Sequence, residues 1–397
     1  MKKLLKKIKK LSSDYHYEII AIRRHLHQYP ELSNEEYKTS EFIVSKLIEY
    51  GIPFEKGIFK TGVVGLIKGK NPDSKVIALR ADMDALPVKE INDVEYKSRN
   101  TGVMHACGHD VHMASLLGTA KILNEIKNDF EGSVKLIFQP AEELIPGGAK
   151  FMIEEGVLKN PNVDKIMGQH VFPELEVGKI GMKTGKYMAS TDEINITVKG
   201  KGGHAALPHL IIDPIYIASQ IVISLQQIVS RNAPFTIPTV LSIGRFIADG
   251  TYNVIPDEVT LKGTFRTFDE KWRAEALQKI AKIAKSIAQG AGGECDVKIS
   301  HGYPYLVNDE NVTEKSFQHA IEYLGKENVV ELEIRMTGED FSYFSQIVPG
   351  CFYRLGTANS TKGIGSNLHK SDYNVDEDCL KTGMGVMAWI ALNQLRD

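Results

Sequence analysis

The chain has 397 residues, which is too many for one ordinary hydrophobic core and predicts roughly two or three domains. Its 43% hydrophobic and 25% charged residues are close to globular averages, and this excludes a disordered or collagen-like chain. A formal net charge of −2 argues against nucleic acid or an anionic membrane surface as a partner, and four scattered cysteines argue against a disulfide framework. We therefore expect a protein of the reducing cytoplasm.

The first ten residues include six lysines. No apolar run follows them, so we do not expect a secretory signal. Nowhere does the chain contain the roughly 18 consecutive apolar residues of a transmembrane helix. We interpret the basic segment as a solvated first helix, because its apolar face is narrow. That face consists of Leu4, Leu5, Ile8 and Leu11.

The predicted elements of the larger domain alternate between helices and short apolar strands. Two helices lie between residues 15 and 50, separated at Pro30, and Ser33 with Glu36 resembles a capping box for the second. Strands are predicted at 62–68, 76–80, 134–139 and 165–167, with helices at about 112–126 and 148–155. Beyond about residue 303 the same alternation of helices and short apolar strands is predicted again. This alternation predicts an α/β fold with a mostly parallel sheet and helices on both faces.

A different pattern occupies residues 181–296. Strands of alternating polarity are predicted at 193–199, 239–247, 258–266 and 296–300, and helices at 214–229 and 271–289. Their order, strand–helix–strand–strand–helix–strand, is that of a ferredoxin-like α+β unit. We therefore expect a discontinuous larger domain, 1–180 and 297–397, into which a smaller domain, 181–296, is inserted.

Five polar clusters belong to loops of the larger domain, and most directly follow a predicted strand. Ligand sites of open α/β sheets form at the carboxyl ends of the strands, so we expect the five clusters to meet there. The clusters are Asp82 with Asp84, the segment His105–His112, Glu142 with Glu143, His170, and His369.

The segment His105–His112 is the strongest signal for a metal. A Cys107-x-His109 pair alone is more often a buried thiol beside a surface histidine. Here His105 and His112 flank the pair, so four potential ligands fall within eight residues. Thiolate and imidazole favour zinc and its first-row neighbours over magnesium or calcium, which prefer oxygen.

Carboxylates complete this predicted site. Glu142 and Glu143 follow an apolar strand, and two buried carboxylates need partners. One of them as a metal ligand and the other as general base is a natural division. Asp82 and Asp84 share one side of the chain, and either is suited to orient a ligand histidine.

The smaller domain carries three further candidates. His204 follows a glycine-rich segment and is a candidate donor to an oxyanion. Asn253 offers an amide, and Arg266 is suited to bidentate recognition of a carboxylate. Each of these three side chains is also typical of an ordinary surface position. No phosphate-binding loop and no serine nucleophile elbow occurs in the sequence.

Taken together, six motifs in this order resemble the N-acyl-amino-acid amidohydrolases of the aminoacylase/carboxypeptidase metallopeptidase superfamily. That group includes hippurate hydrolase, auxin-conjugate hydrolases and N-acetyldiaminopimelate deacetylase. The resemblance runs from about residue 23 to the C-terminus. The motifs are Arg24-His-Leu-His-Gln-Tyr-Pro-Glu-Leu, Arg80-Ala-Asp-Met-Asp-Ala-Leu-Pro, Met104-His-Ala-Cys-Gly-His-Asp-Val-His, Gln139-Pro-Ala-Glu-Glu, Gly203-His-Ala-Ala and Leu368-His.

The resemblance implies a dinuclear site for two divalent transition-metal ions per subunit: zinc, manganese, cobalt or nickel. Glu142 matches the general base, and Asp84 matches the carboxylate that orients a metal-binding histidine. Asp82 is a second candidate for that role, because the wider superfamily has a histidine at its position. The implied metal ligands are Cys107, His109, Glu143, His170 and His369.

The resemblance also implies a reaction and an assembly. The expected activity is metal-dependent hydrolysis of N-acyl-L-amino acids to a carboxylate and a free amino acid. His204 matches a lid histidine that reaches the oxyanion, often from the neighbouring subunit of a homodimer formed through the lid domain. Asn253 and Arg266 match lid positions that touch substrate.

Two alternatives remain open. A dipeptidase or aminopeptidase of the same fold needs a carboxylate for the substrate ammonium, and Glu339 and Asp340 are available for that task. A catalytically silent binding protein on this scaffold is the other alternative, and the complete set of ligands and base argues against it.

Overall fold

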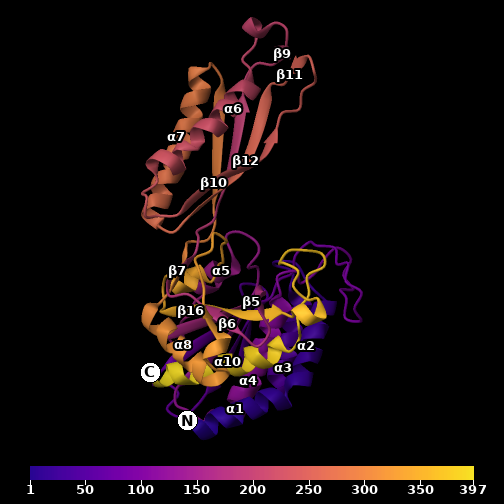
Figure 1. Ribbon diagram of the computed structural model, residues 1–397, viewed down its shortest axis with the longest axis vertical. Coiled ribbons are helices and arrows are strands. Elements are labelled where there is room, and N and C mark those ends of the chain that lie inside the picture. The colour runs from indigo at the N-terminus through magenta and orange to yellow at the C-terminus, as the bar shows by residue number, and fades with distance from the viewer. The chain divides into compact units, whose positions relative to one another are not determined.

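The computed structural model describes residues 1–397, and the chain folds into two compact units (Figure 1). The first unit comprises Met1–Tyr187, Val307–Glu333 and Asp340–Asp397; the second comprises Met188–Leu306 and Ile334–Glu339. These boundaries differ from the expected 181 and 296. The reason is that β6 (Ile180–Met182) belongs to the sheet of the first unit, whereas β13 (Glu294–His301) continues past residue 296 in the second.

The first unit is built on an eight-stranded mixed sheet. Its central strands β4, β3, β5 and β16 are parallel to one another, and antiparallel pairs flank them. β3 and β4 are buried at every position, as a sheet covered on both faces requires. In sheet order the strands are β1 (Phe54–Ile58), β2 (Gly62–Lys68), β4 (Ser133–Gln139), β3 (Val76–Asp82), β5 (Lys165–Glu176), β16 (Gly350–Ala358), β6, and β15 (Val329–Glu331).

Helices cover both faces of this sheet, so the expected α/β class is confirmed. Successive residues of a strand point to opposite faces. On β5, a side chain at Gly168 would meet Phe341, whereas Gln169 donates to the Gly383 carbonyl of α10. The helices are α1 (Lys2–Asp14), α2 (His16–Gln28), α3 (Tyr37–Glu49), α4 (His109–Glu125), α5 (Gly148–Glu154), α8 (Glu310–Leu324), α9 (Ser342–Ser345) and α10 (Cys379–Arg396).

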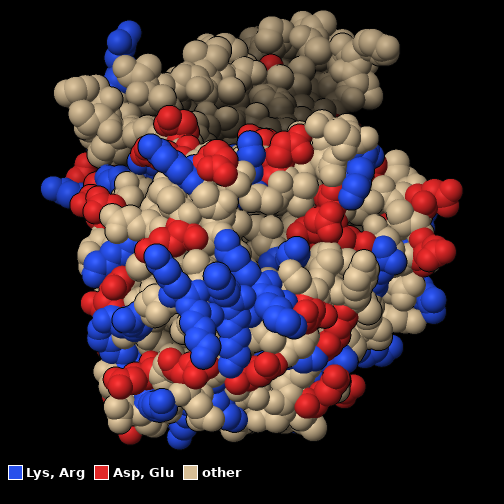
Figure 2. All heavy atoms as spheres, turned by 60° about the horizontal axis from the view of Figure 1, so that its bottom comes forward, with Lys and Arg blue, Asp and Glu red and all other residues tan.

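Helix α1 packs against the core through Ile8 and Leu11, and its six lysines are exposed. Figure 2, which looks onto the face that carries α1, shows lysine and arginine side chains gathered there. No helix of the chain combines the length and the apolar character needed to cross a membrane.

The capping box predicted for α3 is wrong. Glu36 occupies the N-cap position, but its side chain does not cap the helix. Its carboxylate accepts hydrogen bonds from Thr61 and Ala141 instead, and Ser33 donates to Asp84. Tertiary contacts have replaced the capping contacts.

The second unit is a four-stranded antiparallel sheet in the order β10-β12-β8-β13, with α6 and α7 packed against it. Alternate residues of β8, among them Ile194 and Ile196, join Ile217 and Ile280 in its core. The order is the expected ferredoxin-like one. The elements are β8 (Asp192–Lys199), α6 (Pro214–Leu225), β10 (Thr239–Ile247), β12 (Glu258–Thr267), α7 (Glu270–Gly290) and β13, with a short pair formed by β9 (Gly203–His204) and β11 (Val254–Ile255).

Candidate active site

The polar clusters of the first unit meet at the carboxyl end of its parallel strands. β3 ends at Asp82, which lies in register with Gln139 at the end of β4. β5 carries His170 just beyond its pairing with β3. Because parallel strands end at one edge of a sheet, the loops that follow them converge.

A glycine turn places the first two ligand candidates. Gly108 has φ +79° and precedes α4, which begins at His109. A methyl group at Gly108 would lie 2.5 Å from a carbon of Val171. Glycine therefore supplies both the left-handed conformation and the close approach of the turn to β5. The turn leaves Cys107 Sγ 3.5 Å from His170 Nε2.

All five implied ligands come together. His369 Nε2 lies 3.3 Å and His109 Nε2 3.9 Å from Glu143 Oε1. Ligands 2.0–2.3 Å from a tetrahedral ion lie about 3.3–3.8 Å from one another, so these spacings suit metal binding. The overlapping groups of potential ligands are Cys107–His109–His170, Cys107–Glu143–His369 and His109–Glu142–Glu143.

Two orphaned atoms test this fit. His109 Nε2 and Glu143 Oε1 are buried and have no hydrogen-bond partner. A buried polar atom without a partner is costly, and a cation between these atoms would satisfy both. The donor set of thiolate, imidazole and carboxylate fits a first-row transition ion.

The charges around the site favour a cation. Burial lowers the pKa of His109, but Asp82 and Asp84 outweigh burial and raise that pKa to about 10. Burial raises the pKa of the Cys107 thiol well above its usual range, and Glu143 adds to this effect. The site thus gathers more negative than positive groups, and a divalent cation would offset the excess.

Both aspartates lie near His109, but their shortest histidine contacts differ. The Asp84 carbonyl is 2.8 Å from His109 Nδ1, and one of its carboxylate oxygens is 3.3 Å from that atom. The other carboxylate oxygen accepts from the Glu143 backbone N–H at 2.9 Å. Asp84 therefore contacts two ligand candidates. Asp82 instead pairs with His112 Nδ1 at 2.5 Å and with Arg80 at 2.6 Å.

Some supporting contacts carry no readable signal in the sequence. His112, grouped above with the potential ligands, accepts a hydrogen bond from the Val171 backbone instead. Arg23 is fully buried and donates to Asp110 at 2.7 Å, next to His109. These contacts link segments far apart in the chain, so neither periodicity nor motif spacing reveals them.

The second unit separates the three lid candidates into two places. His204 on β9 pairs with Val254, and Ala205 N donates to the Asn253 carbonyl, so His204 and Asn253 are neighbours. His204 is exposed, and its Nδ1 accepts from Ala206 N, which leaves Nε2 as its donor. Arg266 lies near the other end of β12, where its Nε donates to Thr264.

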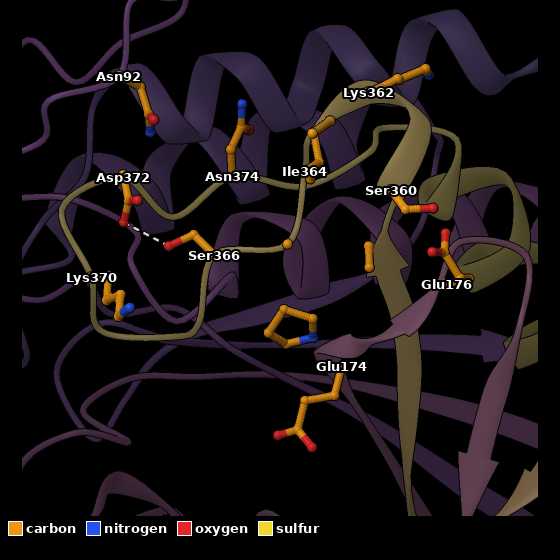
Figure 3. Close-up of a pocket in the computed structure, with 14 residues that line it drawn as sticks. Asn92, Glu174, Glu176, Ser360, Lys362, Ile364, Ser366, Lys370, Asp372 and Asn374 are labelled. Carbon is orange, nitrogen blue, oxygen red and sulfur yellow. Dashed lines mark hydrogen bonds between the residues drawn. The ribbon is translucent and has the colours of Figure 1, made fainter.

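A polar cavity of about 860 Å³ lies beside the loop that carries His369 (Figure 3). Its walls come from the segment 358–374, the end of β5 and Asn92. Ser366 donates to Asp372 at 2.6 Å across this loop, and the side chain of Lys370 extends from the same loop. None of the implied ligands lines the cavity, and no motif in the sequence predicted it.

A comparison with known families decides the identity of the scaffold. The model of peptidase family M20/M25/M40 matches residues 78–393. The chain belongs to this family. It is therefore a hydrolytic enzyme, and the family resemblance drawn from its motifs is confirmed.

Individual relatives agree with this assignment. The chain is 41% identical to N-acetyl-L-cysteine deacetylase of Bacillus subtilis, over 91% of this chain and 85% of the relative. It is 43% identical to thermostable carboxypeptidase 1 of Saccharolobus solfataricus, over 94% of each chain. Among solved structures, the YXEP protein of Bacillus subtilis, described as a dinuclear metal-binding peptidase of the M20 family, superposes with a TM-score of 0.82. That structure shares 37% identity and covers 97% of this chain and 99% of its own.

Proposed function

We propose that this M20 enzyme hydrolyses the amide bond of N-acyl-L-amino acids with two divalent transition-metal ions. The observation that carries the proposal is the pair of orphaned ligand atoms, His109 Nε2 and Glu143 Oε1, beside Glu142. The residues proposed to hold the ions are Cys107, His109, Glu143, His170 and His369. When bound, such ions polarise an acyl carbonyl and lower the pKa of water.

Glu142 is the proposed general base. It lies three residues after the end of β4, it is only 6% exposed, and it groups with Glu143 and His109. Its carboxylate takes a proton from the attacking water and passes it to the leaving amine nitrogen. Asp84 supports this step by holding the His109 ring and the Glu143 backbone. Because Asp82 pairs with His112, Asp84 is the better candidate for the orienting carboxylate.

His204, Asn253 and Arg266 are the proposed substrate contacts, with His204 donating to the oxyanion and Arg266 to the amino-acid carboxylate. Arg266 lies eight residues from Glu258 along β12, and eight residues of a strand span about 27 Å. The β9–β11 pair, which carries His204, comes before Glu258 in the chain. One small substrate cannot span that distance. We therefore propose a homodimer through the lid unit, in which each site takes His204 and Asn253 from the partner.

The relatives support an acylated substrate. The deacetylase relative is named for an N-acetyl amino acid. The carboxypeptidase name fits the same bond, because the C-terminal residue of a peptide is itself an N-acylated amino acid. An aminopeptidase would need a spare carboxylate. Of the two candidates, Asp340 is already bound to Arg80, Gln139 and the Ala149 N–H, and Glu339 is buried and also has a partner.

The proposed compartment is the cytoplasm. All four cysteines are free, and Cys107 must remain reduced to act as a thiolate ligand.

A substrate screen tests the proposed function. The purified enzyme, loaded in turn with zinc, manganese, cobalt or nickel, is assayed with N-acetyl amino acids, hippurate and N-acetyl-diaminopimelate, beside matched free dipeptides. We expect turnover of at least one acylated substrate and slower turnover of every free dipeptide. Faster hydrolysis of the free dipeptides would establish the aminopeptidase alternative, and an inactive protein in all four metal forms would overturn the proposal.

A further inference from the structure

A left-handed turn leads from β4 to Glu142. Ala141 has φ +55°, a conformation that residues with a side chain seldom adopt. Its carbonyl accepts from Gly148 N at 2.9 Å. A methyl group at Gly148 would lie 1.8 Å from the Pro140 carbonyl oxygen, so the turn and α5 are in close contact. Such a conformation persists only where its surroundings hold it.

A buried carboxylate from a distant segment holds this turn. Glu36 is fully buried, and its Oε1 accepts from Ala141 N at 2.9 Å across 105 residues of sequence. Oε1 also accepts from Asn34 N at 3.0 Å, and Oε2 accepts from Thr61 Oγ1 at 2.7 Å. Both backbone polar groups of Ala141 are thus hydrogen-bonded, the N–H to Glu36 and the carbonyl to Gly148.

The same segment also reaches the other side of Glu142. Ser33 Oγ donates to Asp84 Oδ2 at 2.6 Å, and this oxygen accepts from Glu143 N at 2.9 Å. The backbone N–H groups on either side of Glu142 therefore end on the loop before α3: that of Ala141 directly on Glu36, that of Glu143 through Asp84. Glu142 lies between two anchored residues.

We propose that Glu36 is a positioning residue, which holds the left-handed turn at Ala141 and so aims the Glu142 carboxylate. The inference rests on the proposed role of Glu142 as general base. Glu36 itself does not touch the reacting groups. Its effect belongs to the catalytic step, because misplacing a catalytic group by about 1 Å costs up to about 100-fold in rate.

The test compares Glu36→Ala with Glu36→Gln. Glutamine keeps all three contacts: its Oε1 accepts from Ala141 and Asn34, and its amide donates to Thr61. We expect kcat on an N-acetyl amino acid to fall about 10- to 100-fold in Glu36→Ala, with KM and metal content near native. Glu36→Gln should remain within about threefold of the native kcat. Native kcat in Glu36→Ala, or equal losses in both variants, would overturn the proposal.

A double variant isolates the turn. Glycine adopts φ +55° without steric cost, so Ala141→Gly added to Glu36→Ala should recover kcat by several-fold. If Glu36→Ala does not fold, Glu36→Asp takes its place, because a side chain one methylene shorter cannot span Thr61 and Ala141 together; native kcat in Glu36→Asp would then contradict the proposal.

Two further variants separate the possible failures. Glu31 comes from the same segment and accepts from Thr39 at the start of α3, so Glu31→Ala should lower the Tm and leave kcat native. If Glu31→Ala lowers kcat as much as Glu36→Ala does, the effect is general to the segment and the inference fails. Glu142→Gln tests the underlying assignment. An active Glu142→Gln variant would contradict the proposed role of Glu142 as general base. An inactive Glu142→Gln variant together with a native-like Glu36→Ala variant would contradict only the proposed role of Glu36.

Discussion

Asp82 Oδ1 lies 2.5 Å from His112 Nδ1, and the opposite ring nitrogen of His112 accepts from Val171 N at 2.8 Å. The pair therefore fixes one tautomer, with the proton on Nδ1. Because Val171 follows His170, this chain of contacts from β3 through α4 to β5 holds the backbone at a proposed metal ligand.

We expect His112→Ala to weaken metal binding. The change leaves the buried Val171 N–H without an acceptor, which costs about 1–3 kcal/mol of folding free energy. It also frees the strand beside His170, and losing such a support lowers metal affinity by about 10- to 100-fold. Competition with a metal chelator measures the affinity, and urea unfolding measures the stability. A variant with native metal affinity would show that His170 does not depend on His112.

Glu142→Gln should keep its metals and lose its turnover. The amide preserves the shape of the side chain but cannot take a proton, and general-base catalysis contributes about 100- to 10,000-fold. Metal content by elemental analysis should stay near native, while kcat falls by at least 100-fold. The matched change Glu143→Gln should reduce the metal content instead, since Glu143 is a proposed ligand. Loss of metal in Glu142→Gln with full retention in Glu143→Gln would reverse the two assignments.

The sequence predicted the residues of the proposed site more completely than the contacts that support them. Glu142 and His170 are recognisable because each comes after an apolar strand, and Cys107 is recognisable because three histidines lie within five residues of it. The prediction covered only 165–167 of β5, because polar residues interrupt the apolar run there. The strand extends to Glu176. Gln169 is buried there, and its amide nitrogen donates to the Tyr353 hydroxyl and the Gly383 carbonyl, partners that local pattern cannot show.

The contacts that support the proposed site could not be predicted from the sequence for the same reason. Ser33 and Glu36 have the spacing of a capping box, and local chemistry favours that interpretation. In the folded chain Ser33 contacts Asp84 instead, 51 residues away in sequence, and Glu36 contacts Ala141, 105 residues away. Asp82 and Asp84 could not be distinguished, because period two gives the side of the strand and not the partner of each carboxylate.

Mixing two inactive variants tests the proposed dimer. Glu142→Gln lacks the base and His204→Ala lacks the oxyanion donor, so we expect each alone to be nearly inactive. If His204 acts on the partner's site, a hybrid dimer contains one site with both groups intact. Random mixing of equal amounts then restores about a quarter of the native sites.

The control for mixing is a pair that no exchange can repair. Glu142→Gln mixed with a chain carrying both Glu142→Gln and His204→Ala should stay inactive at every ratio. Size-exclusion chromatography with light scattering gives the oligomeric state independently. A dimer that gains no activity on subunit exchange would place His204 on its own chain or outside the reaction.

Glu36 predicts a pH dependence of stability. Burial, and then the nearby Asp84 carboxylate, raise the pKa of Glu36 from 4.5 to about 7. Between these values the folded chain binds a proton that the unfolded chain has lost, so stability falls as the pH rises from about 4.5 through about 7. The shift corresponds to about 3 kcal/mol in total. Glu36→Gln does not titrate, and its stability should therefore increase relative to the native protein across this range. Urea unfolding of both proteins at several pH values measures the difference, and a difference that stays constant with pH would show that folding does not raise the pKa of Glu36.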